Sequence, residues 1–509
     1  MAICAVAGEG ISRADAPMDA SYDAAVRMIH KALVSAKATA ISQSNDAAPV
    51  ITALRSAHDP DLAPMFEKIS QSTVAENQIY AMVALAILNK ENAAAGGSVG
   101  KRVDLEMLLK SRETDLVGAA IASLIDAQAL STDELQTIID KGTEPAHRVM
   151  AAAELQRLKK LANLAPIRDF LKDKSNVVRY YAATVMLSSN DPADVAAALS
   201  TLKELSDPHD LREAPVQALM LVRMEKEKIT AGIPWAAQIV GDGDFDLGLR
   251  FTAISTLLSL HAPEGPKLFS DLVKNQHGLA DQVKLGLIAL AHPGEIPPAT
   301  IAPLLQSQSR LAKAVAAIAQ KAANHEDTTA DLVNLIKVGD PIMIDWSLSY
   351  SDQLDEGGQI ALRTVLANQA RIVDSERDND YEHAAVAVQR LLENDGAAGR
   401  KAVVALLQSN NRSVVEAALA GVYRSTARNQ AELVLPIWNG LTKTTASETS
   451  ANYAALILAR EGRQEPLTWL PGMIAGGAVQ GPGFRALSTW YYAKLTGHSA
   501  DFLKAILAD

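Results

Sequence analysis

Three aspartates alternate with other residues in "GDGDFDLGLR", residues 241–250, at Asp242, Asp244 and Asp246. Alternating carboxylates could bind calcium, because calcium loops place oxygen ligands at alternate positions. Such a loop also needs glycine at its sixth position and glutamate at its twelfth, where this chain has Leu247 and Ala253. We therefore predict that Asp244 or Asp246 caps a helix that begins near Leu247.

Two further segments match ligand-binding motifs only in part. The stretch "AAAGGSVGKR", residues 93–102, has Ala95 in place of the first glycine of a phosphate-binding loop, and it ends on Arg102 instead of Ser or Thr. We predict a flexible loop between repeats there. Residues 373–383, "VDSERDNDYEH", gather acidic side chains that could hold a hard cation. Such a charged run is more typical of a solvated loop between helices, which is our prediction.

No spacing of nucleophiles or metal ligands points to catalysis. The ten histidines are scattered, and none forms the His-x-x-x-His pair of zinc proteases. The single cysteine, Cys4, lies far from any other candidate. The sequence therefore predicts a protein that is not an enzyme and that holds no metal and no cofactor.

Composition indicates close-packed helices and excludes several kinds of partner. Hydrophobic residues make up 48% of the 509 residues but aromatic residues only 4%, so small helix formers supply the apolar surface. The net charge is −11 and no cluster of Lys and Arg occurs, which argues against nucleic acid as a partner. No apolar run approaches the ~20 residues of a membrane span. One cysteine allows no disulfide within the chain.

One pattern recurs along the chain: a polar turn, then an apolar residue, a basic residue, two more residues and alanine. In "KSNVVRYYAATVML", residues 174–187, the basic residue is Arg179. Basic residues occupy this frame at 148, 179, 212, 250 and 284, in steps of 31, 33, 38 and 34 residues. Each unit reads as two short amphipathic helices whose apolar stripes must be buried against neighbouring units. The repeat therefore predicts a helical solenoid.

The repeated frame resembles the HEAT repeat, especially its short, PBS-lyase-like form. The resemblance covers about residues 20–509 and implies an all-α, right-handed α-solenoid, or superhelix, of about thirteen stacked helix pairs. In that family an Asp in the turn and an Arg in the second helix stack into ladders along the solenoid. The matching residues here are Arg148, Arg179, Arg212, Arg250 and Arg485 with Asp173, Asp210 and Asp246, while Glu416 departs from the basic position.

The family implies a non-enzymatic scaffold that binds protein partners through the surface of the solenoid. Some PBS-lyase-like repeat proteins attach or detach bilin chromophores, so a chromophore-handling protein is one alternative. The other is a homo-oligomeric structural subunit of an envelope or surface assembly.

The two ends of the chain differ from the regular repeats. Residues 1–19 read as a disordered segment or the remnant of an export signal, which slightly favours a periplasmic over a cytoplasmic location. Residues 20–427 form the predicted HEAT-like solenoid, and residues 428–509 form atypical, aromatic-rich repeats that cap it. Trp438, Trp469, Trp490 and Tyr491 in this last segment either close the core or bind a partner.

Overall fold

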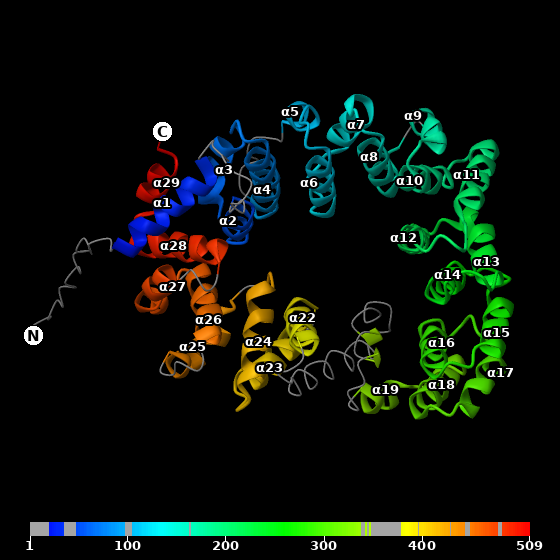
Figure 1. Ribbon diagram of the computed structural model, residues 1–509. Coiled ribbons are helices and arrows are strands. Elements are labelled where there is room, and N and C mark those ends of the chain that lie inside the picture. Colours follow the sequence, from blue (N-terminus) through cyan, green and yellow to red (C-terminus); the bar gives the residue numbers. More distant parts are fainter. Residues whose placement is uncertain are drawn as a thin grey trace, which may run out of the picture. The chain divides into compact units, whose positions relative to one another are not determined.

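The computed structural model describes residues 20–34, 47–96, 104–161, 164–336, 342–343, 346–347, 378–394, 396–427, 429–442, 448–476 and 481–508. Within these ranges every regular element is a helix (Figure 1). The chain forms two compact units, which we call the terminal unit, residues 1–101 with 458–509, and the central unit, residues 102–457. The terminal unit combines segments from both ends of the sequence.

The central unit is a succession of helix pairs. Its helices are α5 (Leu105–Leu109), α6 (Thr114–Asp126), α7 (Thr132–Lys141), α8 (Pro145–Arg157), α9 (Ala165–Arg168), α10 (Asn176–Met186), α11 (Pro192–Leu205), α12 (Ala214–Glu227), α13 (Ile233–Gly241), α14 (Leu247–Ser259), α15 (Gly265–Asn275), α16 (Leu279–Ala291), α17 (Pro298–Ile301), α18 (Arg310–Ala323), α19 (Thr329–Ile336), α22 (Asp378–Asn394), α23 (Gly396–Leu407), α24 (Arg412–Arg424) and α25 (Ala431–Leu441). Short 3-10 helices, η2 (Asp169–Lys172), η3 (Thr230–Gly232) and η4 (Ala302–Gln306), adjoin α9, α13 and α17. Helix α26 (Glu448–Arg460) crosses from this unit into the terminal one.

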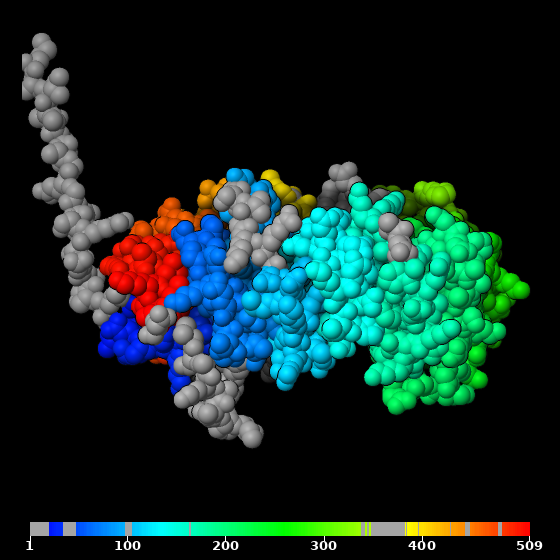
Figure 2. All heavy atoms as spheres, turned by 90° about the horizontal axis from the view of Figure 1, so that it is seen from above, coloured from blue at the N-terminus to red at the C-terminus, as the bar shows by residue number. Residues whose placement is uncertain are grey.

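The pairs stack in two rows. The second helices of the pairs, α6, α8, α10, α12, α14, α16 and α18, each pack against the next, and the first helices α11, α13, α15 and α17 form the other row (Figure 1). In the space-filling view the cyan and green part of the central unit forms one closely packed surface (Figure 2). This two-row stack is an α-solenoid of HEAT-like pairs, as the repeat predicts.

Small residues permit the close contact between second helices. Gly286 on α16 lies so near α18 that an added Cβ would be 2.9 Å from Cγ1 of Val315. Alanines such as Ala182 and Ala253 are fully buried at similar contacts. The excess of alanine over aromatic residues in the composition therefore reflects helices that approach each other closely.

Most second helices end in the same backbone motif. The residue after the helix takes a left-handed conformation, and the next backbone N–H bonds a carbonyl five residues back, which is the Schellman pattern. At α12, Lys228 has φ 56° and the Ile229 N–H donates to the Met224 carbonyl at 2.9 Å. The same residue position is filled by Gln128, Lys159, His261, His325, Gly462 and Gly497. Because most of these residues are not glycine, the motif is hard to recognise in the sequence.

In the terminal unit, the last helices pack on the first ones. The unit contains α1 (Ala20–Val34), α2 (Ala47–Arg55), η1 (Pro60–Leu62), α3 (Ala63–Ile69), α4 (Ala75–Ala94), η8 (Glu465–Thr468), α27 (Leu470–Gly476), α28 (Pro482–Thr496) and α29 (Ser499–Ile506). Helix α28 packs on α2, and α1 packs on α27, α28 and α29 (Figure 1). An added Cβ on Gly483 of α28 would lie 2.6 Å from the Pro49 carbonyl of α2. The last repeat thus stacks on the first as neighbouring repeats do elsewhere.

Polar contacts reinforce this packing of the chain ends. The Trp490 Nε1–H donates to Oδ2 of Asp59 at 3.1 Å, and Lys494 forms an ion pair with the same carboxylate. Nδ1 of His30 lies 2.8 Å from the Ile506 carbonyl oxygen. Each contact joins residues more than 400 positions apart in the sequence.

The structure tests several local predictions from the sequence. Helix α14 begins at Leu247, and Oδ1 of Asp246 accepts the Leu249 N–H at 3.0 Å, which confirms the predicted cap. The predicted loop 373–383 is wrong for residues 378–383, because α22 already begins at Asp378. Acidic residues are favourable at a helix start, where they meet the positive end of the helix dipole.

Other predicted segments lie outside the described residues. These are residues 1–19, residues 97–102 of the predicted loop 93–102, and residues 373–377. The predicted boundary between residues 427 and 428 stays a prediction. In the part of the chain that is described, no helix is long and apolar enough to cross a membrane.

Candidate functional site

The arginines of the predicted ladder bind carbonyl groups within their own repeats. Nε of Arg148 donates to the Ile139 carbonyl at 2.6 Å, and Nε of Arg179 donates to the Leu171 carbonyl at 3.0 Å. Arg250 donates to the Val240 carbonyl at 3.1 Å in the same way. The last carbonyls of a helix have no partner within that helix, so these arginines join each second helix to the end of the first.

The acidic members of the predicted ladder act on their own turns. Oδ1 of Asp173 accepts the Ser175 N–H at 2.8 Å, and Asp246 caps α14. Among the eight predicted ladder residues, the structure brings together only Asp210 and Arg212, which lie 2.7 Å apart at the surface. In place of an Asp–Arg ladder, the arginines bond carbonyls of their own repeats, and two of them reach the next repeat through other residues: Arg179 pairs with Glu204 of α11 at 2.8 Å, and Arg148 lies over the Phe170 ring. The remaining member, Arg485, lies near the start of α28.

Arg212 is also out of register with the other arginines. Arg148, Arg179 and Arg250 each lie three residues after the start of their helix, whereas Arg212 precedes α12, which begins at Ala214. Pro215 suits the first turn of a helix, where no N–H is needed, so the helix starts late. Gln217 occupies the equivalent position and is buried, with its Nε2 donating to the Tyr180 hydroxyl at 2.8 Å.

The aromatic residues predicted to bind a partner or close the core are mostly buried. Trp490 is fully buried, Tyr491 and Trp438 are nearly so, and Trp469 is half-buried. The Trp490 ring packs on Phe502 with ring centroids 5.4 Å apart. The structure thus gives Trp490, Tyr491 and Trp438 a packing role and leaves them little surface for a partner.

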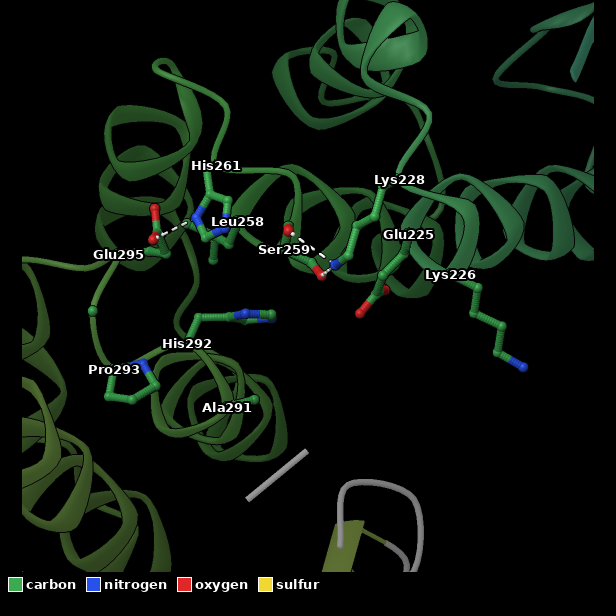
Figure 3. A pocket seen from close by; sticks show the side chains of 11 residues that line it. Glu225, Lys226, Lys228, Leu258, Ser259, His261, Ala291, His292, Pro293 and Glu295 are labelled. Atoms are coloured by element: carbon green, nitrogen blue, oxygen red, sulfur yellow. Dashed lines mark hydrogen bonds and ion pairs between the residues drawn. The ribbon is translucent and has the colours of Figure 1, made fainter. Parts of the chain in front are cut away.

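Two cavities lie where the second helices of the central unit end. The larger, of about 1140 Å³, is bounded by the C-terminal ends of α8, α10 and α12 and by α9, and it extends to the start of α11. The smaller, of about 470 Å³, is bounded by the ends of α12, α14 and α16 (Figure 3). Lys226 and Lys228 line both cavities. We call the two together the helix-end groove.

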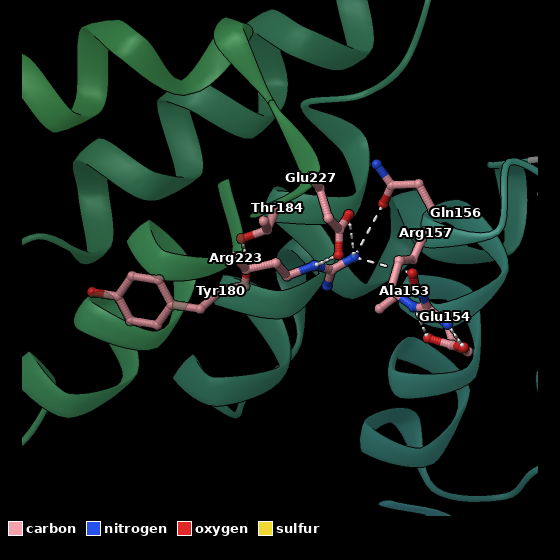
Figure 4. Close-up of polar contacts among 8 residues, drawn as sticks. All are labelled: Ala153, Glu154, Gln156, Arg157, Tyr180, Thr184, Arg223 and Glu227. Carbon is pink, nitrogen blue, oxygen red and sulfur yellow. Dashed lines mark hydrogen bonds and ion pairs between the residues drawn. The ribbon is translucent and has the colours of Figure 1, made fainter. Parts of the chain in front are cut away.

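Arg223 joins helices on either side of the larger cavity. Its NH2 group donates to the Ala153 carbonyl at 3.2 Å and to Oε1 of Gln156 at 3.3 Å, so α12 is bonded to α8 (Figure 4). Nε of Arg223 bonds Glu227 at 2.8 Å, and only 11% and 13% of these two side chains are exposed. A planar guanidinium can hold both partners at once, which fixes the wall of the groove.

The carboxylates of the larger cavity are neutralised by arginines. Nε and NH2 of Arg168 bond the two oxygens of Asp194 at 2.6 and 2.9 Å, and Ser189 donates to Oδ2 of the same carboxylate. The hydrogen bonds and charge of Arg168 hold the pKa of Asp194 below its ordinary value. Asp191 also lies 3.6 Å from Arg168. Asp194 is therefore ionised at neutral pH, and both acids already have Arg168 as a partner.

The smaller cavity contains two histidines of different character. His261 is exposed, and its Nδ1 lies 2.7 Å from Glu295 (Figure 3). His292 is buried, with its Nε2 3.0 Å from the Ser255 hydroxyl, and burial lowers the pKa of His292 to about 4. His292 is therefore neutral at pH 7, and it lines the cavity with only 9% of its surface exposed. Within the described residues, no group of three or more His, Cys, Asp or Glu is placed to hold a metal ion.

Two exposed apolar side chains, Leu219 and Val222, lie on α12, whose C-terminal end lines the groove. All six large hydrophobic residues that are exposed in the described ranges lie between residues 158 and 279: Leu158, Val177, Leu211, Leu219, Val222 and Leu279. No motif or spacing in the sequence predicted this site. One signal was available, because "ALMLV", residues 218–222, is apolar around the whole helix and cannot be buried on every side.

Comparisons with known proteins add low similarity to solved helical structures. No protein-family model matches the sequence, and no curated protein matches it significantly. Kap121p bound to RanGTP resembles the chain with a TM-score of 0.34 and 13% identity, over 95% of this chain and 54% of the Kap121p chain. For Kap121p bound to the SUMO protease Ulp1p, the TM-score is 0.29 and the identity 12%, over 94% of this chain and 57% of the Kap121p chain. For an engineered protein, the TM-score is 0.24 and the identity 16%, over 78% of this chain and 97% of the engineered chain.

The chain thus spans little more than half the length of the Kap121p chains that it resembles. The assignment of the fold rests on the stacking of helix pairs described above.

Proposed function

We propose that the protein is a non-enzymatic HEAT-like scaffold that binds a partner protein at the helix-end groove. The repeats are of the short, PBS-lyase-like form, which is supported by the steps of 31 to 38 residues between basic positions. The observation that carries the proposal is the exposed pair Leu219 and Val222 on one face of α12, the helix whose C-terminal end lines both cavities. Contiguous apolar surface on a soluble protein is typical of protein-binding sites.

The chemistry of the groove supports binding over catalysis. Asp194 and Glu227 are held by arginines in defined geometry, and the His292–Ser255 contact is buried. A general base must reach its substrate and must change protonation near neutral pH. The low pKa of His292 and its burial do not suit that role.

Site-specific crosslinking tests the proposed function. A photoreactive amino acid at Leu219 on α12 should give one discrete protein adduct in native cells. The same group at Lys203 is the matched control, because Lys203 is exposed on α11 in the row of first helices. The adduct should be lost when Val222 is also changed to Glu. Equal adducts at both positions, or none at either, would contradict binding at the groove.

A further inference from the structure

We propose that the helix-end groove binds an acidic, amphipathic segment of the partner protein. Its apolar side chains would pack on Leu219 and Val222 of α12, and its carboxylates would reach Lys226, Lys228 and Lys159. This inference rests on the proposed function and specifies the chemistry of the partner.

The apolar part of the surface is a row along one face of α12. Leu219, Val222 and Lys226 follow at spacings of three and four residues, so they share a helix face. Leu219 is 50% exposed and Val222 is 37% exposed. The row ends at Lys226, which lines both cavities.

Among α12 and the second helices around it, only α12 exposes an apolar residue at the position of Val222. Counted from the start of each second helix, the positions equivalent to Val222 are Ala153 in α8, Thr184 in α10, Ser255 in α14 and Leu287 in α16. All four of these residues are buried. Helix α12 therefore presents apolar surface where the adjacent second helices bury theirs, and a partner that covers Val222 would remove it from water.

The charges of the larger cavity favour an acidic partner. Five cationic and three acidic side chains line it, in a chain whose net charge is −11. The three acids, Asp191, Asp194 and Glu227, already have arginine partners.

Three lysines of the cavity have no acidic partner among the described residues. Lys159 and Lys226 make no ion pair there, and Lys228 donates only to the carbonyl and hydroxyl of Ser259. Glu225 and Glu295, in the smaller cavity, are the acids of the groove without a Lys or Arg partner in the same ranges, and Glu295 contacts His261. The charge left to be complemented is therefore positive, which suits carboxylates of the partner.

The backbone holds two of these lysines at fixed places. Lys159 and Lys228 each occupy the left-handed position of a Schellman motif, with φ of 55° and 56°. The motifs end α8 and α12, the two helices that Arg223 joins. Carboxylates on one partner segment can therefore meet both lysines without rearrangement of the groove.

Synthetic peptides can test this chemistry on the full chain. The probe is a fluorescein-labelled helical peptide built from Leu and Glu, with the Leu residues on one face. One comparison peptide has Lys in place of every Glu, and another has Ser in place of every Leu. Fluorescence anisotropy should show that only the Leu/Glu peptide binds, with roughly tenfold or greater loss for the other two. Affinity should fall as salt rises, because exposed charges are screened.

Variants locate the binding. Lys226→Glu with Lys228→Glu should weaken the Leu/Glu peptide about tenfold or more, and Lys159→Glu on a different helix should weaken it in the same direction. Val222→Glu should also weaken it. Lys203→Glu on α11 carries the same type of charge reversal and should change the affinity less than about twofold.

Several results would overturn the inference. The Lys-containing peptide could bind as well as the Leu/Glu peptide, or the charge reversals in the groove could have no more effect than Lys203→Glu. The Ser-containing peptide could bind equally and be displaced by inorganic phosphate, which would indicate a site for small anions. If the peptides fail while crosslinking at Leu219 still gives a discrete adduct, the partner class is wrong and the proposed function stands. If crosslinking fails as well, both are wrong.

Discussion

Replacing Asp59 with alanine should loosen the contact between the first and last repeats in the terminal unit. The Asp59 side chain is 6% exposed and its carboxylate has three partners. It accepts the Trp490 Nε1–H at 3.1 Å and the Asp61 N–H at 3.2 Å, and it pairs with Lys494. The first N–H bond and the ion pair join the end of the chain to its beginning.

The size of the effect follows from what each partner loses. The buried Trp490 N–H would be left without an acceptor, which costs about 1–3 kcal/mol. Loss of the cap on η1 costs about 1 kcal/mol. Lys494 is 42% exposed and lies 3.3 Å from Asp61, so its loss is small. The cap is lost whether or not α28 opens, so the opening of α28 becomes easier by the Trp490 share of about 1–3 kcal/mol, or roughly 5- to 140-fold.

Native-state hydrogen exchange, read by mass spectrometry on peptides from α2 and α28, measures this opening directly. Asp61→Ala is the matched control, because Asp61 pairs with the same lysine but its side chain is 59% exposed. The control should change the opening free energy by less than about 1 kcal/mol. If the two variants exchange alike in α28, the buried contacts of Asp59 do not hold the chain ends together and the reasoning fails.

Three further predictions concern single side chains. Arg223→Ala should destabilise the central unit by about 3 kcal/mol, because the substitution leaves buried acceptors unpaired. Thermal unfolding should show a far smaller loss of stability for Arg212→Ala, because the Arg212 side chain is 88% exposed. Burial lowers the pKa of His292 from 6.5 to about 4, so between these pH values the unfolded state binds a proton on His292 more readily than the folded state does. The free energy of unfolding is therefore unaffected by this group above pH 6.5 and falls by about 3 kcal/mol as the pH drops toward 4. His292→Gln should remove this part of the acid sensitivity in unfolding curves recorded across that range. Gly483→Ala should destabilise the terminal unit in the hydrogen-exchange assay, because the added Cβ would lie 2.6 Å from the Pro49 carbonyl oxygen. Gly472→Ala is the control and should have no such effect, because no atom lies within 4 Å of its added Cβ.

The sequence predicted the features that local chemistry determines. The three- and four-residue spacing of apolar residues predicted the helices, and the repeat of 31 to 38 residues predicted their stacking in pairs. Asp246 was predicted as a cap because a side-chain oxygen before a helix has free N–H groups to accept. These inferences need only neighbours within one repeat.

The features that sequence reasoning missed depend on exact register and on distant contacts. Arg212 follows an apolar residue as the repeated frame requires, but Pro215 stands where the frame has alanine and shifts the helix start, so that Gln217 takes the equivalent place. A left-handed residue such as Lys228 has no glycine to indicate it. Exposure of Val222 depends on how far α12 projects from its neighbours, which no pattern within α12 determines.

The packing of the last repeat on the first also bears on the choice between a scaffold and a subunit of a larger assembly. A terminal repeat normally leaves one side of its core open unless a cap covers it. Here α28 covers α2, and α1 lies on α27, α28 and α29, so the two terminal repeats bury these faces on each other. Copies that stack end to end would first have to separate these helices and break the buried contacts of Asp59 and Trp490. A partner bound at the helix-end groove requires no such opening, and this favours the scaffold over an assembly built through the ends of the repeats.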